Sequence, residues 1–158
     1  MRNYQQLWIT FGWHKEIINP FKHIHMYYLI LCPFQLDTAL QRIYTYLQRF
    51  AVGLEEVVLD QALFDGEFFQ EFNEAEFKLK SVLCELQMAM LERDIEFGED
   101  ISREIMNDDV RDIQDTSYRN LRDWYIYRDY MNGLEYIVQS FDYLKKIHHS
   151  PSHTYASS

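Results

Sequence analysis

The sequence predicts an all-α protein, an antiparallel bundle of three long helices and one short helix. Prolines occur at positions 20, 33 and 151, so residues 34–150 contain none. Helices accommodate a proline-free run of this length, whereas β-sandwiches rarely show one. Within the run, apolar residues recur at alternating spacings of four and three, the period of one helix face. A chain of 158 residues suits one domain with a hydrophobic core.

Three regions are expected along the chain. Residues 1–33 hold two prolines and no clean period, so they are predicted to form an irregular lead-in. Residues 34–147 form the helical bundle domain. Residues 148–158 are polar and are predicted to be a flexible tail.

The first helix is predicted from about residue 36 to residue 63. Asp65-Gly66 ends it, because glycine tolerates left-handed backbone angles. Its core-facing residues follow the alternating spacing: Leu36, Leu40, Ile43, Leu47, Phe50, Leu54 and Val57.

The second helix is predicted over residues 67–97, with Gly98 as its natural stop. The short break before it predicts an antiparallel hairpin with the first helix. Glutamates 74, 85 and 92 fall on the polar side. The expected core residues are Phe72, Ala75, Leu79, Val82, Leu86 and Met90.

An acidic stretch, residues 99–115, is expected to include a short helix near 101–106. The third long helix is predicted over residues 116–146. Arg122 and Asp129 fall on its polar face, and we expect Trp124 and Leu134 to be buried. The full predicted core seam is Trp124, Tyr127, Met131, Leu134, Val138 and Phe141.

Composition excludes several classes of function. A net charge of −10 argues against a nucleic-acid partner or an anionic membrane, because phosphate-rich surfaces attract Lys and Arg. No apolar segment reaches the roughly 18–20 residues of a membrane-spanning helix, so we expect no membrane insertion. The two cysteines, Cys32 and Cys84, are expected to be free thiols, with Cys84 a small buried apolar residue.

The sequence offers little for catalysis. No histidine lies between residues 26 and 147, which removes di-iron motifs and Ser-His or Cys-His dyads from the helical body. The five glycines form no phosphate-binding loop. The histidines of the lead-in and tail are best explained as solvated side chains. We therefore expect no enzyme, no cofactor and no metal site.

Two segments resemble a known family. "SVLCELQMAML" (81–91) and "IQDTSYRNLRDWYIYRDYMNGLEYIVQSFDYLKK" (113–146) are similar to the last two helices of long-chain four-helix cytokines. The class is that of ciliary neurotrophic factor, cardiotrophin-like cytokine and leukaemia inhibitory factor. Trp124, Ile126 and Arg128 also resemble, more distantly, the final helix of type I interferons. The resemblance implies an up-up-down-down bundle, secretion and binding to a cell-surface receptor.

The sequence departs from that family in two ways. The family often carries a Phe-x-x-Lys receptor motif at the start of its last helix, where this chain reads Tyr118-Arg119-Asn120-Leu121. The literal match, Phe77-x-x-Lys80, falls in the second helix, where a core phenylalanine is expected. The three long helices would then be the second to fourth of an incomplete bundle. Residues 1–33 would be a degenerate signal or a replaced first helix.

By the resemblance, the partner-binding residues are expected to be Tyr118, Arg122 and Asp129 on the last helix, or else the acidic face around Glu85 and Glu92. Two other classes stay open. One is an intracellular helical adaptor or regulator that acts by protein–protein contact. The other is a helical enzyme whose site includes histidines of residues 1–33. The sequence names neither the receptor nor the oligomeric state.

Overall fold

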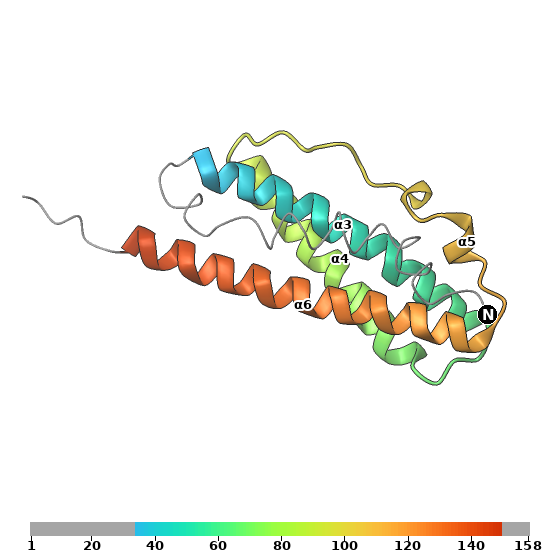
Figure 1. Ribbon diagram of the computed structural model, residues 1–158. Coiled ribbons are helices and arrows are strands. Elements are labelled where there is room, and N and C mark those ends of the chain that lie inside the picture. The colour runs from blue at the N-terminus through green and yellow to red at the C-terminus, as the bar shows by residue number, and fades with distance from the viewer. Residues whose placement is uncertain (1–33, 150–158) are drawn as a thin grey trace, which may run out of the picture.

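The computed structural model describes residues 34–149 (Figure 1). Those residues are mostly helical and contain no strand, which confirms the all-α class. The predictions for residues 1–33 and for residues 150–158 concern parts of the chain outside the described residues. The elements are α3 (Phe34–Leu63), α4 (Phe69–Glu92), the 3-10 helix η1 (Arg103–Ile105), α5 (Asp108–Arg111) and α6 (Thr116–His149).

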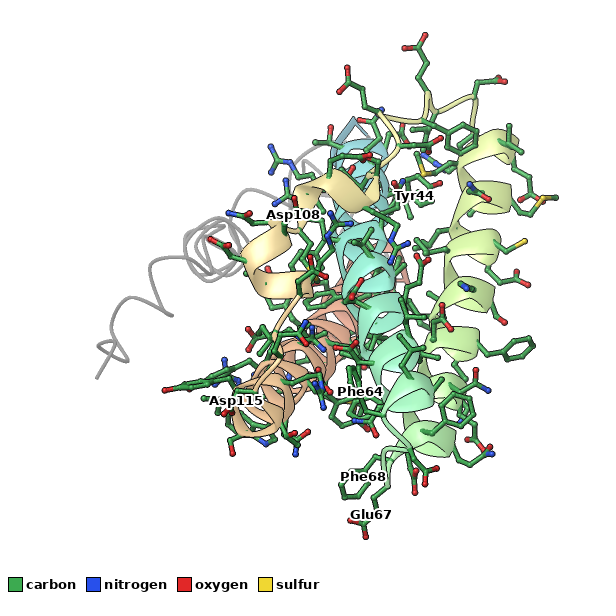
Figure 2. The ribbon with its side chains drawn as sticks, turned by 90° about the vertical axis from the view of Figure 1, so that its right-hand side faces the viewer. Tyr44, Phe64, Glu67, Phe68, Asp108 and Asp115 are labelled. Atoms are coloured by element: carbon green, nitrogen blue, oxygen red, sulfur yellow. The ribbon has the colours of Figure 1, made fainter. Side chains whose placement is uncertain are left out.

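The helix α3 is the centre of this arrangement. It packs extensively on α4 and less extensively on α6, while α4 and α6 touch each other little. Both partners run antiparallel to α3 and therefore parallel to each other (Figure 1). Residues 93–115 return along the length of the bundle from the end of α4 to the start of α6. Seen from the right-hand end of Figure 1, α3 stands between its two partners (Figure 2).

The core is built mainly on α3. Its predicted seam is confirmed: every member except the half-buried Leu36 is buried, and four of them have no exposed surface. Leu79 and Met90 of α4 are equally buried. Burying such side chains contributes about 1.5–3 kcal/mol each, so this contact is a main source of stability. The four fully buried residues of α3 are Leu47, Phe50, Leu54 and Val57.

The turn between α3 and α4 lies where the Asp-Gly pair predicted it. The left-handed residue is Asp65, with φ of 52°, rather than the glycine. Gly66 is required for a different reason: a Cβ there would lie 2.0 Å from Oε1 of Gln61. That oxygen accepts a hydrogen bond from the backbone N–H of Phe68 at 3.2 Å, so it is not free to move away.

The helix α4 ends at Glu92, five residues before the predicted end, and Gly98 is not its stop. The chain turns at Asp94, which has φ of 54°. The N–H of Ile95 then returns to the carbonyl of Met90 at 2.9 Å. This turn buries Ile95 against the core, and that burial explains the early stop.

The predicted core seam of α6 is wrong by one residue. Trp124 is 54% exposed, and Tyr127, Met131, Val138 and Phe141 are exposed as well, while Leu134 is half-buried against the core. The buried positions precede the predicted ones. They are Ile126, Tyr130, Gly133 and Ile137. One residue corresponds to about 100° around a helix, so α6 is turned by that angle from the expected orientation.

Gly133 explains much of this rotation. A Cβ at this position would lie 2.7 Å from Cε1 and 2.9 Å from the hydroxyl of Tyr46. The missing side chain therefore lets α6 approach α3 closely at this point. Tyr46 itself is buried, and burial, followed by the nearby charge of Asp129, raises the pKa of its hydroxyl.

Two smaller boundaries also differ from expectation. The short helix expected near 101–106 is the 3-10 turn η1, and the one-turn helix α5 follows it without having been predicted. The helix α6 continues through His149, two residues into the range expected to be a tail. Val82, expected in the core of α4, is exposed.

Candidate partner-binding surfaces

Arg122 is buried at the start of α6, where it holds three segments together. Its side chain is 1% exposed. Nη2 donates to Oδ2 of Asp60 on α3 at 2.6 Å and to Oδ1 of Asp123 at 2.6 Å. Nη1 donates to the carbonyls of Val110 and Arg111 at 3.1 and 3.3 Å. The guanidinium thereby ties α6 to α3 and to α5.

Two carboxylates share this one guanidinium. Burial raises the pKa of Asp123, while Arg122 and the amide of Gln61 oppose the rise and Asp60 adds to it. The amide Nε2 of Gln61 donates to Oδ2 of Asp123 at 3.2 Å. A buried set of this kind costs desolvation energy and is kept only with dense hydrogen bonding. These hydrogen bonds fix the orientation of α6 relative to α3.

The predicted site residues are therefore not brought together on one exposed surface. The expected exposure of Arg122 is wrong, because a partner cannot reach its guanidinium. Tyr118 is 38% exposed in the first turn of α6, which Asp115 caps by accepting the N–H groups of Ser117 and Tyr118. Asp129 is half-buried and pairs with Nη2 of Arg128 at 2.6 Å.

Arg128 lies over two rings of its own helix. Its guanidinium carbon is 5.0 Å from the ring centre of Trp124 and 4.7 Å from that of Tyr125. The two rings are themselves 5.1 Å apart. Cation–π contacts of this kind stabilise a partly exposed aromatic group by about 0.5–1 kcal/mol. They hold Trp124 in place while leaving half of it accessible.

The outer side of α4 carries an apolar row that sequence reasoning missed. Phe77 is 70% exposed, Met88 and Leu91 are 52% and 56% exposed, and Cys84 is an exposed free thiol. Phe77 and Cys84 were expected to be buried, and both expectations are wrong. We call these four residues, Phe77, Cys84, Met88 and Leu91, the outer α4 surface.

The signal for this surface was present in the sequence. The four residues follow one another at spacings of seven, four and three, so they share one helix face. That face is opposite the buried one, which carries Leu79, Leu86 and Met90. Exposed glutamates border the row: Glu74, Glu85 and Glu92. The acidic face expected around Glu85 and Glu92 is thus adjacent to an apolar strip.

A second exposed apolar row lies on α6. It consists of Trp124, Tyr127, Met131, Val138 and Phe141, which we call the α6 stripe. The ring of Tyr127 meets the ring of Phe72 on α4 at 5.5 Å and nearly at a right angle. The stripe therefore lies on the side of α6 that is turned toward α4.

Across residues 34–149, histidine, cysteine and carboxylate side chains do not gather into a group able to hold a metal ion. No helix in that range combines the length and apolar character needed to cross a bilayer.

Comparison of the chain with protein-family models, with curated proteins and with solved structures finds no match in any of the three.

Proposed function

We propose that the protein acts by binding another protein through the outer α4 surface, as a secreted, cytokine-like ligand of a cell-surface receptor. The observation that carries the proposal is the exposed apolar row on α4, headed by Phe77 at 70% exposure. Each of its larger side chains would gain about 1.5–3 kcal/mol on full burial. The proposal assigns the chain a binding role rather than a catalytic one.

The chemistry of the partner follows from the border of this surface. Glu85 and Glu92 are exposed beside the apolar row, whereas Glu74 is paired with Lys78 at 3.0 Å. The chain as a whole carries a net charge of −10. A partner that presents an apolar strip flanked by Lys or Arg would be complementary in both respects. Opposite charges of this kind steer association and select against acidic competitors.

The connections between the helices support the cytokine-like class. A tight turn joins α3 to the antiparallel α4, and a crossover of residues 93–115 joins α4 to the parallel α6 (Figure 1). The last three helices of an up-up-down-down bundle have the same directions and the same kind of crossover. The resemblance of residues 81–91 and 113–146 to such helices adds to this support.

An intracellular adaptor that acts by protein–protein contact is the second candidate. The observation that favours it is the exposed free thiol of Cys84, because reduced thiols persist in the cytosol and are less common in secreted proteins. Localisation separates the two candidates. The receptor ligand requires that cells expressing the natural transcript release the protein into the medium.

The binding surface can be tested on intact cells. The labelled protein is expected to bind saturably, with competition by unlabelled protein and loss of binding after protease treatment of the cell surface. A Phe77→Ser, Met88→Ser double variant should bind at least tenfold more weakly, because interface anchors contribute about 2 kcal/mol or more each. The matched control is Leu63→Ser, which removes a similarly exposed side chain at the end of α3.

Two outcomes would overturn the proposal. Unchanged binding by the double variant, with the melting temperature of the parent, would remove the outer α4 surface from the interface. Equal loss in the Leu63→Ser control would show that general surface apolarity drives binding instead of this surface.

A further inference from the structure

We propose that residues 1–33 of this chain dock along the α6 stripe and fill the open corner between α6 and α4. This goes beyond the proposed partner binding, because it uses a different face of the molecule.

The contacts among the three long helices leave most of the α6 stripe uncovered by either α3 or α4. Helix α3 contacts both α4 and α6, whereas α4 and α6 touch each other little. Three parallel or antiparallel helices in this relation occupy three corners of a square, and the fourth corner is bordered by α4 and α6. In Figure 2, α3 stands between α4 and α6, and η1 and α5 lie beside α3 on the side away from α4.

The lining of the corner on the α6 side is the α6 stripe. Its members repeat at spacings of three, four and seven, which is the seam pattern that a neighbouring helix covers. Tyr127 contacts Phe72 of α4, so the stripe is turned toward the corner and not toward open solvent on the outside. Trp124 and Phe141 at its ends are about 26 Å apart along the helix.

Residues 1–33 are rich in apolar side chains and carry a positive net charge, which complements an apolar stripe on an acidic protein. Eighteen of the 33 are apolar, among them Trp8, Phe11, Trp13 and Phe21. The segment holds three Lys or Arg residues and one Glu, a net charge of +2, which leaves −12 on residues 34–158. A basic, apolar segment attached to an acidic body with an uncovered apolar stripe gains from both burial and charge.

The attachment point places the segment at the right end of the site. Residue 33 precedes Phe34, where α3 begins, and this end of the bundle is also the end at which α6 finishes (Figure 1). A chain of 33 residues can span up to about 110 Å when extended, or about 50 Å as a helix, so the stripe is within reach in either form. Covalent attachment gives an effective concentration of the order of millimolar.

A second copy of the chain is the competing occupant. It would bring another net charge of −10 to an already acidic body, and it lacks the advantage of attachment. The observations therefore favour the chain's own segment.

Photo-crosslinking of the full chain tests the proposal. The probe is p-benzoylphenylalanine in place of Phe141 in the stripe. The matched control carries the same probe in place of Phe77, an exposed phenylalanine of the outer α4 surface. After irradiation at micromolar concentration, mass spectrometry should place crosslinks from position 141 within residues 1–33. The control position should give several-fold fewer crosslinks to that segment.

Charge variants supply an independent arm. A Lys15→Glu, Lys22→Glu variant should reduce the crosslink yield from position 141 several-fold, because it reverses the charge of the segment. A Lys78→Glu, Lys80→Glu variant adds the same negative charge to α4 and should not reduce the yield. Crosslinked dimers, or crosslinks from position 141 that avoid residues 1–33, would overturn the proposal. Equal loss in both charge variants would also overturn it.

Discussion

Nη2 of Arg122 lies 2.6 Å from Oδ2 of Asp60, although the two residues are 62 positions apart in the chain. The same nitrogen reaches Asp123, and the other terminal nitrogen reaches two backbone carbonyls before α6. The guanidinium of Arg122 therefore connects α3, α6 and the crossover between α4 and α6. It makes a buried polar group responsible for the orientation of the last helix.

Arg122→Met is expected to lower the free energy of unfolding by about 3–5 kcal/mol, because it leaves two buried carboxylates without their counter-charge. Chemical denaturation followed by circular dichroism measures the effect. The control is Arg93→Ala, which breaks the exposed ion pair with Asp37 and should cost no more than about 1 kcal/mol.

A triple variant separates charge loss from lost packing. Arg122→Met combined with Asp60→Leu and Asp123→Leu should recover most of the stability, because an apolar set of similar volume replaces a buried ion set with little loss. Failure of the triple variant to recover would mean that packing around the guanidinium, and not its charge pairing, holds α6.

Asp123→Asn is expected to cost more stability at pH 4.5 than at pH 7. Burial raises the pKa of Asp123 in the folded protein above its unfolded value of about 3.9. The stabilising contribution of this carboxyl group is therefore complete below the unfolded pKa and is lost as the pH rises through the folded pKa. Unfolding free energies of both proteins at the two pH values measure the difference; a smaller cost at pH 4.5 would contradict the raised pKa.

Gly133→Ala is expected to destabilise the protein by about 1–3 kcal/mol, despite the higher helix propensity of alanine. The new Cβ would meet the ring of Tyr46 at 2.7 Å and that of Phe50 at 3.2 Å. Gly98→Ala is the matched control, because the nearest atom to its Cβ is the hydroxyl of Thr45 at 3.7 Å. Thermal melts of the two variants give the comparison, and equal melting temperatures would rule out the close approach at Gly133.

Asp65→Gly is expected to stabilise the protein by about 0.5–1 kcal/mol. Asp65 has φ of 52°, a left-handed conformation that costs an L-residue with a Cβ about 1–2 kcal/mol. Part of this gain is offset by the greater freedom of glycine in the unfolded chain. Asp100→Gly, in the crossover and without a positive φ, should give no such gain in the same denaturation experiment.

The sequence predicted α3 well because its buried face is broad. Seven regularly spaced apolar residues mark that face, and α4, α6 and the crossover cover most of the helix. The Asp-Gly turn was equally visible, since few residue pairs end a helix so clearly. Both features depend on local pattern alone.

The orientation of α6 could not be predicted because its two candidate faces have the same period. Most residues of the exposed set lie directly after a buried one, as Tyr127 follows Ile126 and Trp124 follows Asp123. The buried face also includes Arg122, Asp123 and Gly133, which resemble a solvated surface in sequence. Their burial depends on Asp60 and Tyr46 of α3, and a local pattern contains no information about partners so distant in the chain.

The outer α4 surface was missed for a related reason. An apolar row on an amphipathic helix is ordinarily assigned to the core. Helix α4 carries two such rows on opposite faces. The row with Leu79 and Met90 is the more regular one, so it was predicted to be the core face. The spacing from Phe77 to Leu91 indicated a shared face, but only the packing against α3 distinguishes the buried row from the exposed one.

The central place of α3 also has a consequence for the dynamics of the described helices. Because α4 and α6 pack on α3 and little on each other, either one can detach while the other stays in place. Amide protons of α3 should therefore exchange with solvent only when the whole domain unfolds, and those of α4 and α6 through two separate partial openings of lower free energy. In a molecule organised in this way, global unfolding depends on α3. The helices α4 and α6 can each respond to a binding partner independently of the other.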